Sequence, residues 1–205
     1  MEHKEHIEAI IKRTFKIIKE VYDYQQEKFE GPKISSDKLS RIIFPQKRQE
    51  DNDNKQTITR VSEQELKLIF IEQLNLEICE RNWDVYYSVE TPTEKKYRFT
   101  GEKQPKQDDS GRSANFDLVI HDNKFKRIAL IEFKANNPKS SDYLKDFVKL
   151  NEENYEGKVL KYFIEIVKNA DSGTSNNLQE KVKGNEGIFW CYSLEKGEII
   201  NSPIK

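Results

Sequence analysis

Side chains that act as soft metal ligands or as nucleophilic catalysts are scarce in this chain of 205 residues. The two cysteines, Cys79 and Cys191, lie far apart and have no metal-ligand neighbours, which predicts free thiols in a reducing cytoplasm and argues against a zinc site. Of the three histidines, His3 and His6 are expected on the surface of an N-terminal helix, and His121 in a turn without a nearby nucleophile. We therefore expect neither Ser–His nor Cys–His catalysis.

Long apolar runs, glycine-rich phosphate loops and internal repeats are also missing. No stretch approaches the length that spans a membrane, and the charged N-terminus, MEHKEHIEAI, lacks the apolar core of a secretory signal. The net charge of −1 gives no overall attraction to nucleic acid, so an enzyme that acts on nucleic acid would depend on local basic patches and on a metal ion. With 35% charged and 35% hydrophobic residues, the composition predicts a folded cytoplasmic protein with long solvated helices and loops.

Residues 1–56 are predicted to form a helical extension followed by a polar linker. Apolar side chains recur at three- and four-residue steps from about residue 4 to residue 29, where Gly31-Pro32 ends the pattern. A second short helix is expected from Ser35 to Phe44, and the run from Gln46 to Gln56 has no apolar residue and is typical of a solvated loop. The long helix most simply packs on its own domain, and a homodimer contact is the alternative.

Residues 57–205 are predicted to form an α/β (α+β) domain with a mixed central sheet flanked by helices. Its first helix starts with a capping box of Ser62 and Glu65 and ends before Trp83. Strands are then expected at 83–90, 95–100, 116–120, 127–134, 160–167, 187–194 and 198–200, with helices at 141–155 and 178–183.

The segment NFDLVIHDNKFKRIALIEFKA, residues 115–135, is the most informative part of the sequence. Glu132 and Lys134 end a strongly apolar strand, where charges are costly unless they meet partners, a metal ion or water. Side chains alternate along a strand, so these two residues share a face and Phe133 points to the opposite one. The alternative is an ordinary ion pair where the strand emerges into solvent.

The preceding strand carries a second carboxylate, Asp117. A turn centred near Lys124 and Phe125 would place Asp117 opposite Glu132, with Cβ atoms about 5 Å apart, which is close enough for both carboxylates to bind one ion. Without a cation two such carboxylates repel each other, so the pairing itself indicates one.

These residues resemble the motif of the PD-(D/E)xK superfamily, the restriction-endonuclease-like phosphodiesterases. By this resemblance Asp117 is the motif aspartate, Glu132 its acidic residue and Lys134 its lysine, while Phe116 replaces the proline that names the motif. The resemblance covers roughly residues 62–194, whose expected elements follow the order of the restriction-endonuclease-like αβββαβ core. The first sixty residues lie outside it.

The resemblance implies a Mg²⁺- or Mn²⁺-dependent endonuclease that hydrolyses phosphodiester bonds, in DNA rather than RNA. Asp117, Glu132 and the backbone carbonyl of Phe133 would hold the ion, which activates a water and neutralises charge on the phosphate. Lys134 would position or deprotonate that water, or stabilise the developing negative charge. Beside two carboxylates it should stay protonated at rest, so a role as base requires metal and substrate to bind first.

The superfamily also places a helix glutamate beside the metal. We favour Glu63 as a catalytic or metal-binding residue, because Glu65 already serves the capping box; the alternative for Glu63 is a helix-dipole role. Candidate nucleic-acid contacts are Arg112, in the polar loop before the Asp117 strand, and Lys145 and Lys149 on the following helix, for which a solvated surface is the simpler interpretation.

Two alternatives to a simple nuclease stay open. The same fold can serve as a non-catalytic scaffold that binds nucleic acid or a protein partner in a regulatory or defence-related role. It can also belong to a toxin-like or defence nuclease whose N-terminal helices mediate assembly. The complete set of Asp117, Glu132 and Lys134 argues against a degenerate enzyme, and the frequent lysine, asparagine and isoleucine indicate an AT-rich bacterial or phage genome.

Overall fold

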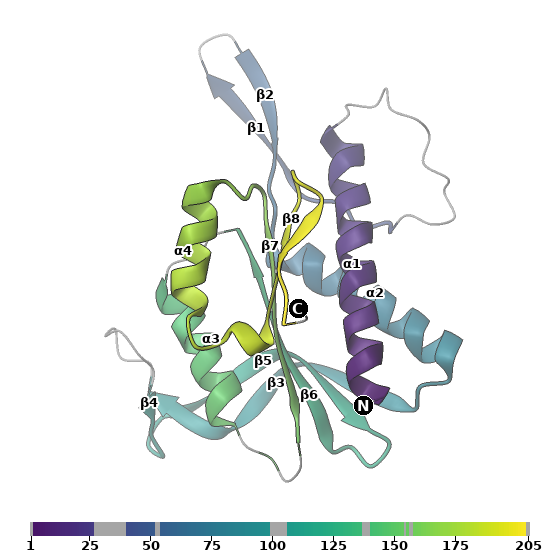
Figure 1. The fold of residues 1–205 in the computed structure, drawn as a ribbon, viewed down its shortest axis with the longest axis vertical. Helices are drawn as coiled ribbons and strands as arrows, with labels where there is room; N and C mark the ends of the chain where they lie inside the picture. Colours follow the sequence, from purple (N-terminus) through teal and green to yellow (C-terminus); the bar gives the residue numbers. More distant parts are fainter. Residues whose placement is uncertain are drawn as a thin grey trace.

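The computed structural model describes residues 2–26, 40–51, 54–98, 106–136, 140–153, 155 and 158–203. Within these ranges the chain is an α/β protein with four α-helices and a seven-stranded mixed sheet (Figure 1). The elements in chain order are α1 (Glu2–Gln26), β1 (Gln46–Asp51), β2 (Asn54–Thr59), α2 (Glu63–Arg81), β3 (Val85–Arg98), β4 (Lys106–Gln107), β5 (Arg112–Asp122), β6 (Arg127–Ala135), α3 (Ser140–Glu152), β7 (Leu160–Val167), α4 (Ser172–Val182), a 3-10 helix (Glu186–Ile188), β8 (Phe189–Ser193) and β9 (Glu198–Asn201).

The sheet has the strand order β4-β3-β5-β6-β7-β8-β9, with β6 in the middle. Strands β3, β5 and β6 form an antiparallel meander, β7 and β8 continue parallel to β6, and β9 returns antiparallel. Parallel neighbours require crossover connections, which α3 and α4 supply. Both faces of β6 are therefore covered, and this explains its nearly continuous apolar sequence.

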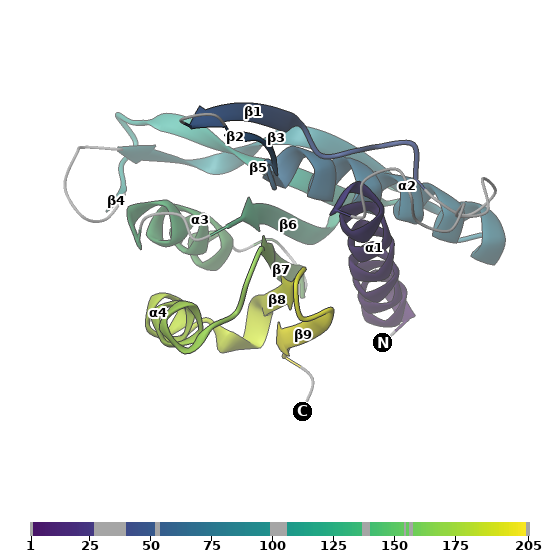
Figure 2. The same cartoon turned by 90° about the horizontal axis from the view of Figure 1, so that it is seen from above.

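One face of the sheet is covered by α1 and α2, which also pack against each other (Figure 2). The ring of Phe70 on α2 lies 5.3 Å from that of Phe133 on β6, and Phe15 on α1 stacks on Tyr192 of β8 at 4.9 Å. The apolar side chains of α1 are thus buried against the sheet, as expected for a helix that packs on its own domain. The domain boundary at residue 56 stays a prediction.

The opposite face carries α3 and α4 (Figure 2). Its core is aromatic: Phe163 on β7 contacts Tyr143 and Phe147 of α3, at 5.4 Å and 4.6 Å between ring centroids, and Phe189 of β8 at 5.8 Å. Two hydrophobic layers therefore enclose the sheet, and Asp117, Glu132 and Lys134 lie on β5 and β6 away from the turn that joins these strands.

Several predicted elements are confirmed. Helix α2 begins after Ser62, whose hydroxyl accepts from the Gln64 amide and also bonds the Glu65 carboxylate, and it ends before Trp83. Strand β7 has the expected bounds, and β8 and β9 fall within one or two residues of theirs. Helix α1 starts at Glu2, and the last expected positions, 27–29, lie outside the described residues.

The polar run after Pro45 was predicted as a loop, and this prediction is wrong. Strands β1 and β2 pair over their full lengths and project from the body as a two-stranded hairpin (Figure 1). The Gln25 side chain donates to the Phe44 carbonyl at 2.9 Å and accepts from its amide at 2.8 Å, and the Arg60 amide donates to the Pro45 carbonyl. The base of the hairpin is therefore fixed to the end of α1.

Other boundaries also differ from the prediction. The short helix expected at 35–44 falls partly outside the described residues, and its described part, 40–44, is not helical. Strands expected at 83–90 and 95–100 are one strand, β3, whose pairing with β5 is irregular between Pro92 and Lys96. The last helix, α4, starts earlier than expected, because the Asp171 side chain caps it by accepting from the Thr174 amide at 2.7 Å. Among the described residues, no helix combines the length and hydropathy that crossing a bilayer requires.

Candidate active site

The hairpin of β5 and β6 has the predicted turn and register. The turn includes Lys124 and Phe125, and Phe125 has a left-handed φ of 60°. Leu118 lies opposite Ile131, so the same register brings Asp117 beside Glu132. The two carboxylates that the sequence placed together are therefore on adjacent strands of one sheet.

The Asp117 side chain is anchored at the point where backbone pairing of β5 and β6 ends. Its Oδ2 accepts a hydrogen bond from the Phe133 amide at 2.8 Å, and its Oδ1 lies 3.7 Å from the Nζ of Lys67 on α2. Lys67 also forms an ion pair with Glu90 of β3 at 2.7 Å. By the register of β3 and β5, Glu90 lies at the level of Asp117, so a third carboxylate stands beside the predicted pair.

The Glu132 side chain is 2% exposed and forms an ion pair with the Nζ of Lys149 on α3 at 2.6 Å. Burial raises the pKa of Glu132 well above its usual value, and the carboxylates of Asp146 and Asp117 raise it further, while Lys149 opposes them. Glu132 therefore lies in a region with an excess of negative charge.

Lys134 points to the same side of the sheet and meets two acids. Its Nζ lies 2.7 Å from Oδ2 of Asp146 and 3.8 Å from Oε2 of Glu63. Burial alone would lower the pKa of Lys134, but the neighbouring Asp146, Glu63 and Glu132 carboxylates outweigh it and raise the pKa. The lysine is therefore held in its charged form.

Glu63, at the first turn of α2, reaches this cluster, whereas Glu65 bonds the Ser62 hydroxyl. Partial burial raises the pKa of Glu63, and Asp117 raises it further while Lys134 lowers it. The preferred helix glutamate, Glu63, thus lies in the cluster, and its role there stays a prediction.

The structure brings all four predicted catalytic residues together and adds four that the prediction missed or assigned differently. The added residues are Lys67, Glu90, Asp146 and Lys149. A signal for Asp146 existed, because it lies within the apolar stripe of α3, where a charge requires a buried partner. Lys67 follows Glu63 by four residues and so shares its helix face.

Lys149 is a predicted candidate contact to nucleic acid, with a solvated surface as the simpler interpretation, and the solvated surface is wrong for this side chain. It is buried, and its Nζ is surrounded by Glu132, Asp146 and the Asn115 carbonyl. Arg112 and Lys145 are exposed, at the start of β5 and on the outer side of α3, and their contact with nucleic acid stays a prediction.

Eight charged side chains gather at this end of the sheet, five carboxylates and three ammonium groups, so that their formal charge is −2 when all are ionised. They are Glu63, Glu90, Asp117, Glu132, Asp146, Lys67, Lys134 and Lys149. Among the residues that the structure describes, no three acidic, histidine or cysteine side chains converge as a ready metal site. The cluster is an ion-pair network with excess negative charge.

The oxygen atoms able to hold a hard cation are Asp117 Oδ1 and Glu132 Oε2, because Oδ2 of Asp117 accepts from Phe133 and Oε1 of Glu132 faces Lys149. The Phe133 side chain lies in the opposite core, as predicted. The Phe133 backbone contacts the site through its amide, which donates to Asp117. The Phe133 carbonyl therefore stays a predicted metal ligand.

His3 is exposed on α1, as predicted, but His121 and His6 depart from their predicted settings. His121 Nε2 lies 2.8 Å from the Ser88 hydroxyl, so the prediction that it lacks a nearby nucleophile is wrong. Its Nδ1 faces the Phe125 carbonyl at 3.3 Å rather than a carboxylate, unlike the usual triads. His6 is partly buried between Glu77, at 2.6 Å, and the ring of Trp83 rather than on the open surface.

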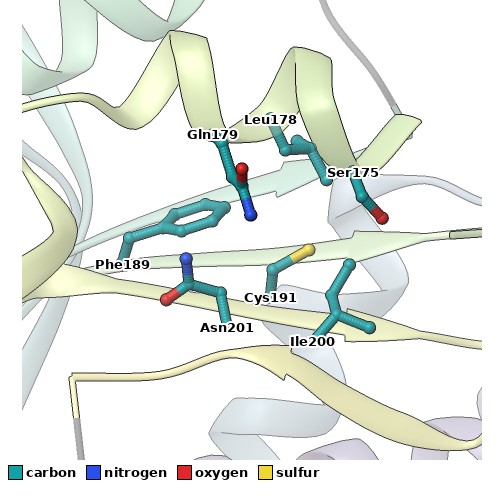
Figure 3. Close-up of a pocket in the computed structure, with 7 residues that line it drawn as sticks. All are labelled: Ser175, Leu178, Gln179, Phe189, Cys191, Ile200 and Asn201. Atoms are coloured by element: carbon teal, nitrogen blue, oxygen red, sulfur yellow. The ribbon is translucent and has the colours of Figure 1, made fainter. Parts of the chain in front are cut away.

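A shallow pocket lies away from the charged cluster, between α4, β8 and β9 (Figure 3). Gln179 and Asn201 face each other across it, and the Cys191 thiol lies at its base. Burial and the nearby Glu165 raise the pKa of Cys191 well above its usual value, so this thiol is unreactive. Both cysteines are free, Cys79 at the surface and Cys191 in the core.

Comparison of the chain with protein-family models, with curated proteins and with solved structures finds no match in any of the three.

Proposed function

We propose that this protein is a divalent-metal-dependent nuclease of the PD-(D/E)xK type that hydrolyses the phosphodiester backbone of DNA in the cytoplasm. The observation that carries the proposal is the register that sets Asp117 beside Glu132, with Lys134 on the same face of the sheet. Glu63, which comes from a separate helix more than fifty residues earlier, reaches the same place.

The order of elements supports this assignment. The superfamily core would consist of α2, the meander of β3, β5 and β6, then α3, β7, α4 and β8. In that arrangement β6 carries the acidic residue and the lysine at its end, and α1 with the β1–β2 hairpin forms an N-terminal addition.

Mg²⁺ or Mn²⁺ fits the donor set, because both prefer oxygen ligands and the cluster carries a formal charge of −2. Asp117 and Glu132 would hold the ion, Glu132 through Oε2 and Asp117 through Oδ1, which Lys67 approaches to 3.7 Å. When bound, the ion would lower the pKa of a water molecule and offset charge on the scissile phosphate.

Lys134 would act as a hydrogen-bond donor. Its raised pKa keeps it charged, so it is suited to orient the attacking water and to stabilise the negative charge that develops on the phosphate. Glu63 would accept a proton or orient water, because its carboxylate lies 3.8 Å from Lys134 and partial burial raises its pKa above the ordinary value.

A non-catalytic scaffold is the second candidate, favoured by the closed ion-pair network and the net charge of −1. A DNA-cleavage assay distinguishes the nuclease from the non-catalytic scaffold. Purified protein is incubated with supercoiled, linear, branched and single-stranded DNA, with and without Mg²⁺ or Mn²⁺, alongside Lys134→Ala.

Lys124→Ala is the matched control, because Lys124 is exposed at the opposite end of the same β5–β6 hairpin. Metal-dependent cleavage by the wild type and by Lys124→Ala, but not by Lys134→Ala, is the expected result. If the wild type cuts none of the substrates with either metal, or if Lys134→Ala cuts as fast as the wild type, the proposed site is wrong.

A further inference from the structure

Helix α3 presents two charged residues to the candidate site, Asp146 and Lys149, which are three positions apart. The Lys149 ammonium lies 2.6 Å from Oε1 of Glu132, 2.8 Å from Oδ1 of Asp146 and 2.8 Å from the Asn115 carbonyl. The ammonium therefore donates a hydrogen bond to the Asn115 carbonyl and lies within ion-pair distance of two carboxylate oxygens. Because Lys149 is also almost completely buried, its position is fixed.

Asp146 joins the two halves of the site. Its Oδ1 contacts Lys149, and its Oδ2 lies 2.7 Å from the Nζ of Lys134. A continuous chain of alternating charge therefore runs from Glu132 through Lys149 and Asp146 to Lys134. Glu132 and Lys134 share one face of β6, and α3 lies over that face, so a single helical turn contacts both.

We propose that Asp146 and Lys149 are positioning residues of this site: Lys149 aims the free oxygen of Glu132 at the metal, and Asp146 aims the ammonium of Lys134 at the reacting phosphate. The inference rests on the proposed nuclease function and deepens it.

Carboxylates that bind metals are commonly held by hydrogen bonds from a surrounding set of residues, and loss of such a partner typically weakens metal binding about 10- to 100-fold. Lys149 has this relationship to Glu132, as the Phe133 amide has to Asp117. Each carboxylate thus has one oxygen in close contact with a donor, Oε1 of Glu132 with Lys149 and Oδ2 of Asp117 with the Phe133 amide.

A purely electrostatic role for Lys149 predicts the opposite effect. Removing its positive charge makes the cluster more negative, and a more negative cluster attracts a divalent cation more strongly. The direction of the change in metal affinity therefore separates a residue that orients Glu132 from one that competes with the ion for it.

The experiment measures Mn²⁺ binding without DNA, by titration calorimetry and by the electron paramagnetic resonance spectrum of the bound ion. The first variant is Lys149→Met. Because loss of a buried ammonium can disturb folding, the second variant is Lys149→Gln, which retains a hydrogen-bond donor. Lys145→Met is the control, since it removes the same charge from an exposed position one turn away on α3. Circular dichroism establishes that each variant is folded.

We expect Mn²⁺ to bind about 10- to 100-fold more weakly to Lys149→Met, less weakly to Lys149→Gln, and within about twofold of the wild type to Lys145→Met. Equal or tighter binding by the Lys149 variants would overturn the inference. If Lys149→Met does not fold, the result for Lys149→Gln decides alone. Absence of Mn²⁺ binding to the wild type would instead contradict the proposed function.

Asp146→Asn tests the other half. The amide is the same size but carries no charge, so Lys134 loses the nearer of its two ion-pair partners and keeps only Glu63 at 3.8 Å, while Asp117 and Glu132 are unaltered. We expect kcat for DNA cleavage at saturating Mn²⁺ to fall at least about tenfold, with KM for DNA little changed, because the lost alignment acts in the transition state. An unchanged kcat, or a loss confined to KM, would show that Asp146 does not position Lys134.

Discussion

The amide nitrogen of Phe133 lies 2.8 Å from Oδ2 of Asp117, so an acidic side chain takes the place of a strand carbonyl where β5 and β6 part. This contact gives Asp117 a structural role in addition to its proposed role as a metal ligand. The two roles can be separated, because only the second requires the negative charge.

Asp117→Asn and Asp117→Ala should therefore behave differently. Asparagine still offers an oxygen to the Phe133 amide, so we expect stability near that of the wild type but loss of Mn²⁺ binding. Alanine should lose Mn²⁺ binding and in addition about 1 kcal/mol of unfolding free energy. Urea unfolding and calorimetry measure the two effects; retained Mn²⁺ binding by Asp117→Asn would contradict the ligand assignment.

Two glutamates near the start of α2 should give opposite phenotypes. Glu63 approaches Lys134, so Glu63→Gln should lower kcat for DNA cleavage about tenfold or more and leave stability unchanged. Glu65 accepts a hydrogen bond from the hydroxyl of Ser62, the N-cap residue of α2, so Glu65→Ala should lose about 0.5–1 kcal/mol of stability and retain activity. Urea unfolding and steady-state cleavage are measured for both variants. If Glu65→Ala lost activity and Glu63→Gln lost stability instead, the two assigned roles would be exchanged.

Glu165 should make the protein less stable as the pH rises. It is fully buried beneath α3, and burial raises its pKa to about 8, although the hydroxyl of Tyr143 donates to it at 2.5 Å. Between its ordinary value of 4.5 and about 8, the folded protein retains a proton that the unfolded chain releases. The unfolding free energy then falls with rising pH, by at most about 1.4 kcal/mol per pH unit.

Glu165→Gln should make this slope less steep, because Glu132 and Glu63 also have raised pKa values, while Glu180→Gln, which changes an exposed acid on α4, should leave it unchanged. The slopes are measured by urea unfolding between about pH 5 and about pH 8, the range in which the folded and unfolded chains differ in the ionisation of Glu165. An equal slope in wild type and Glu165→Gln would mean that Glu165 is not the group responsible.

Gln25 should contribute more to stability than its neighbour Gln26. Gln25 satisfies both backbone groups of the buried Phe44, so Gln25→Ala leaves a buried amide and carbonyl without partners, and we expect a loss of about 1–3 kcal/mol. Gln26 makes an exposed bond to Thr59, and Gln26→Ala should change stability by less than about 0.5 kcal/mol. If the two variants lose similar amounts of unfolding free energy in urea, the Gln25 hydrogen bonds to the Phe44 backbone do not contribute to stability.

Local patterns carried much of the fold. The apolar run of β6 and the polar turn before it fix the β5–β6 register, and from that register the meeting of Asp117 with Glu132 follows. The Ser62 capping box likewise marks the start of α2. These signals work because each depends on residues close together in the sequence.

The features that the sequence concealed depend on distant partners. The hairpin of β1 and β2 has no apolar alternation, so nothing in its own sequence distinguishes it from a loop. Pro92 and the residues around it indicated a turn, yet β3 continues through them. Strand β4 pairs with β3 only farther along, at Tyr97 and Arg98. Pro92 therefore lies at an open edge of the sheet, where its missing N–H costs little. Lys149 has the sequence pattern of a surface lysine until α3 is placed over β6.

The central position of β6 also decides when the site can form during synthesis. Every charged residue of the cluster has been added once Lys149 is made, but β6 gains its second neighbour only with β7, and Phe15 of α1 gains Tyr192 only near the end of the chain. A growing polypeptide thus contains the proposed cutting groups before it has a sheet to align them. The proposed cleavage of DNA therefore has to wait until the chain has been made through β8, because only then are both faces of the sheet covered.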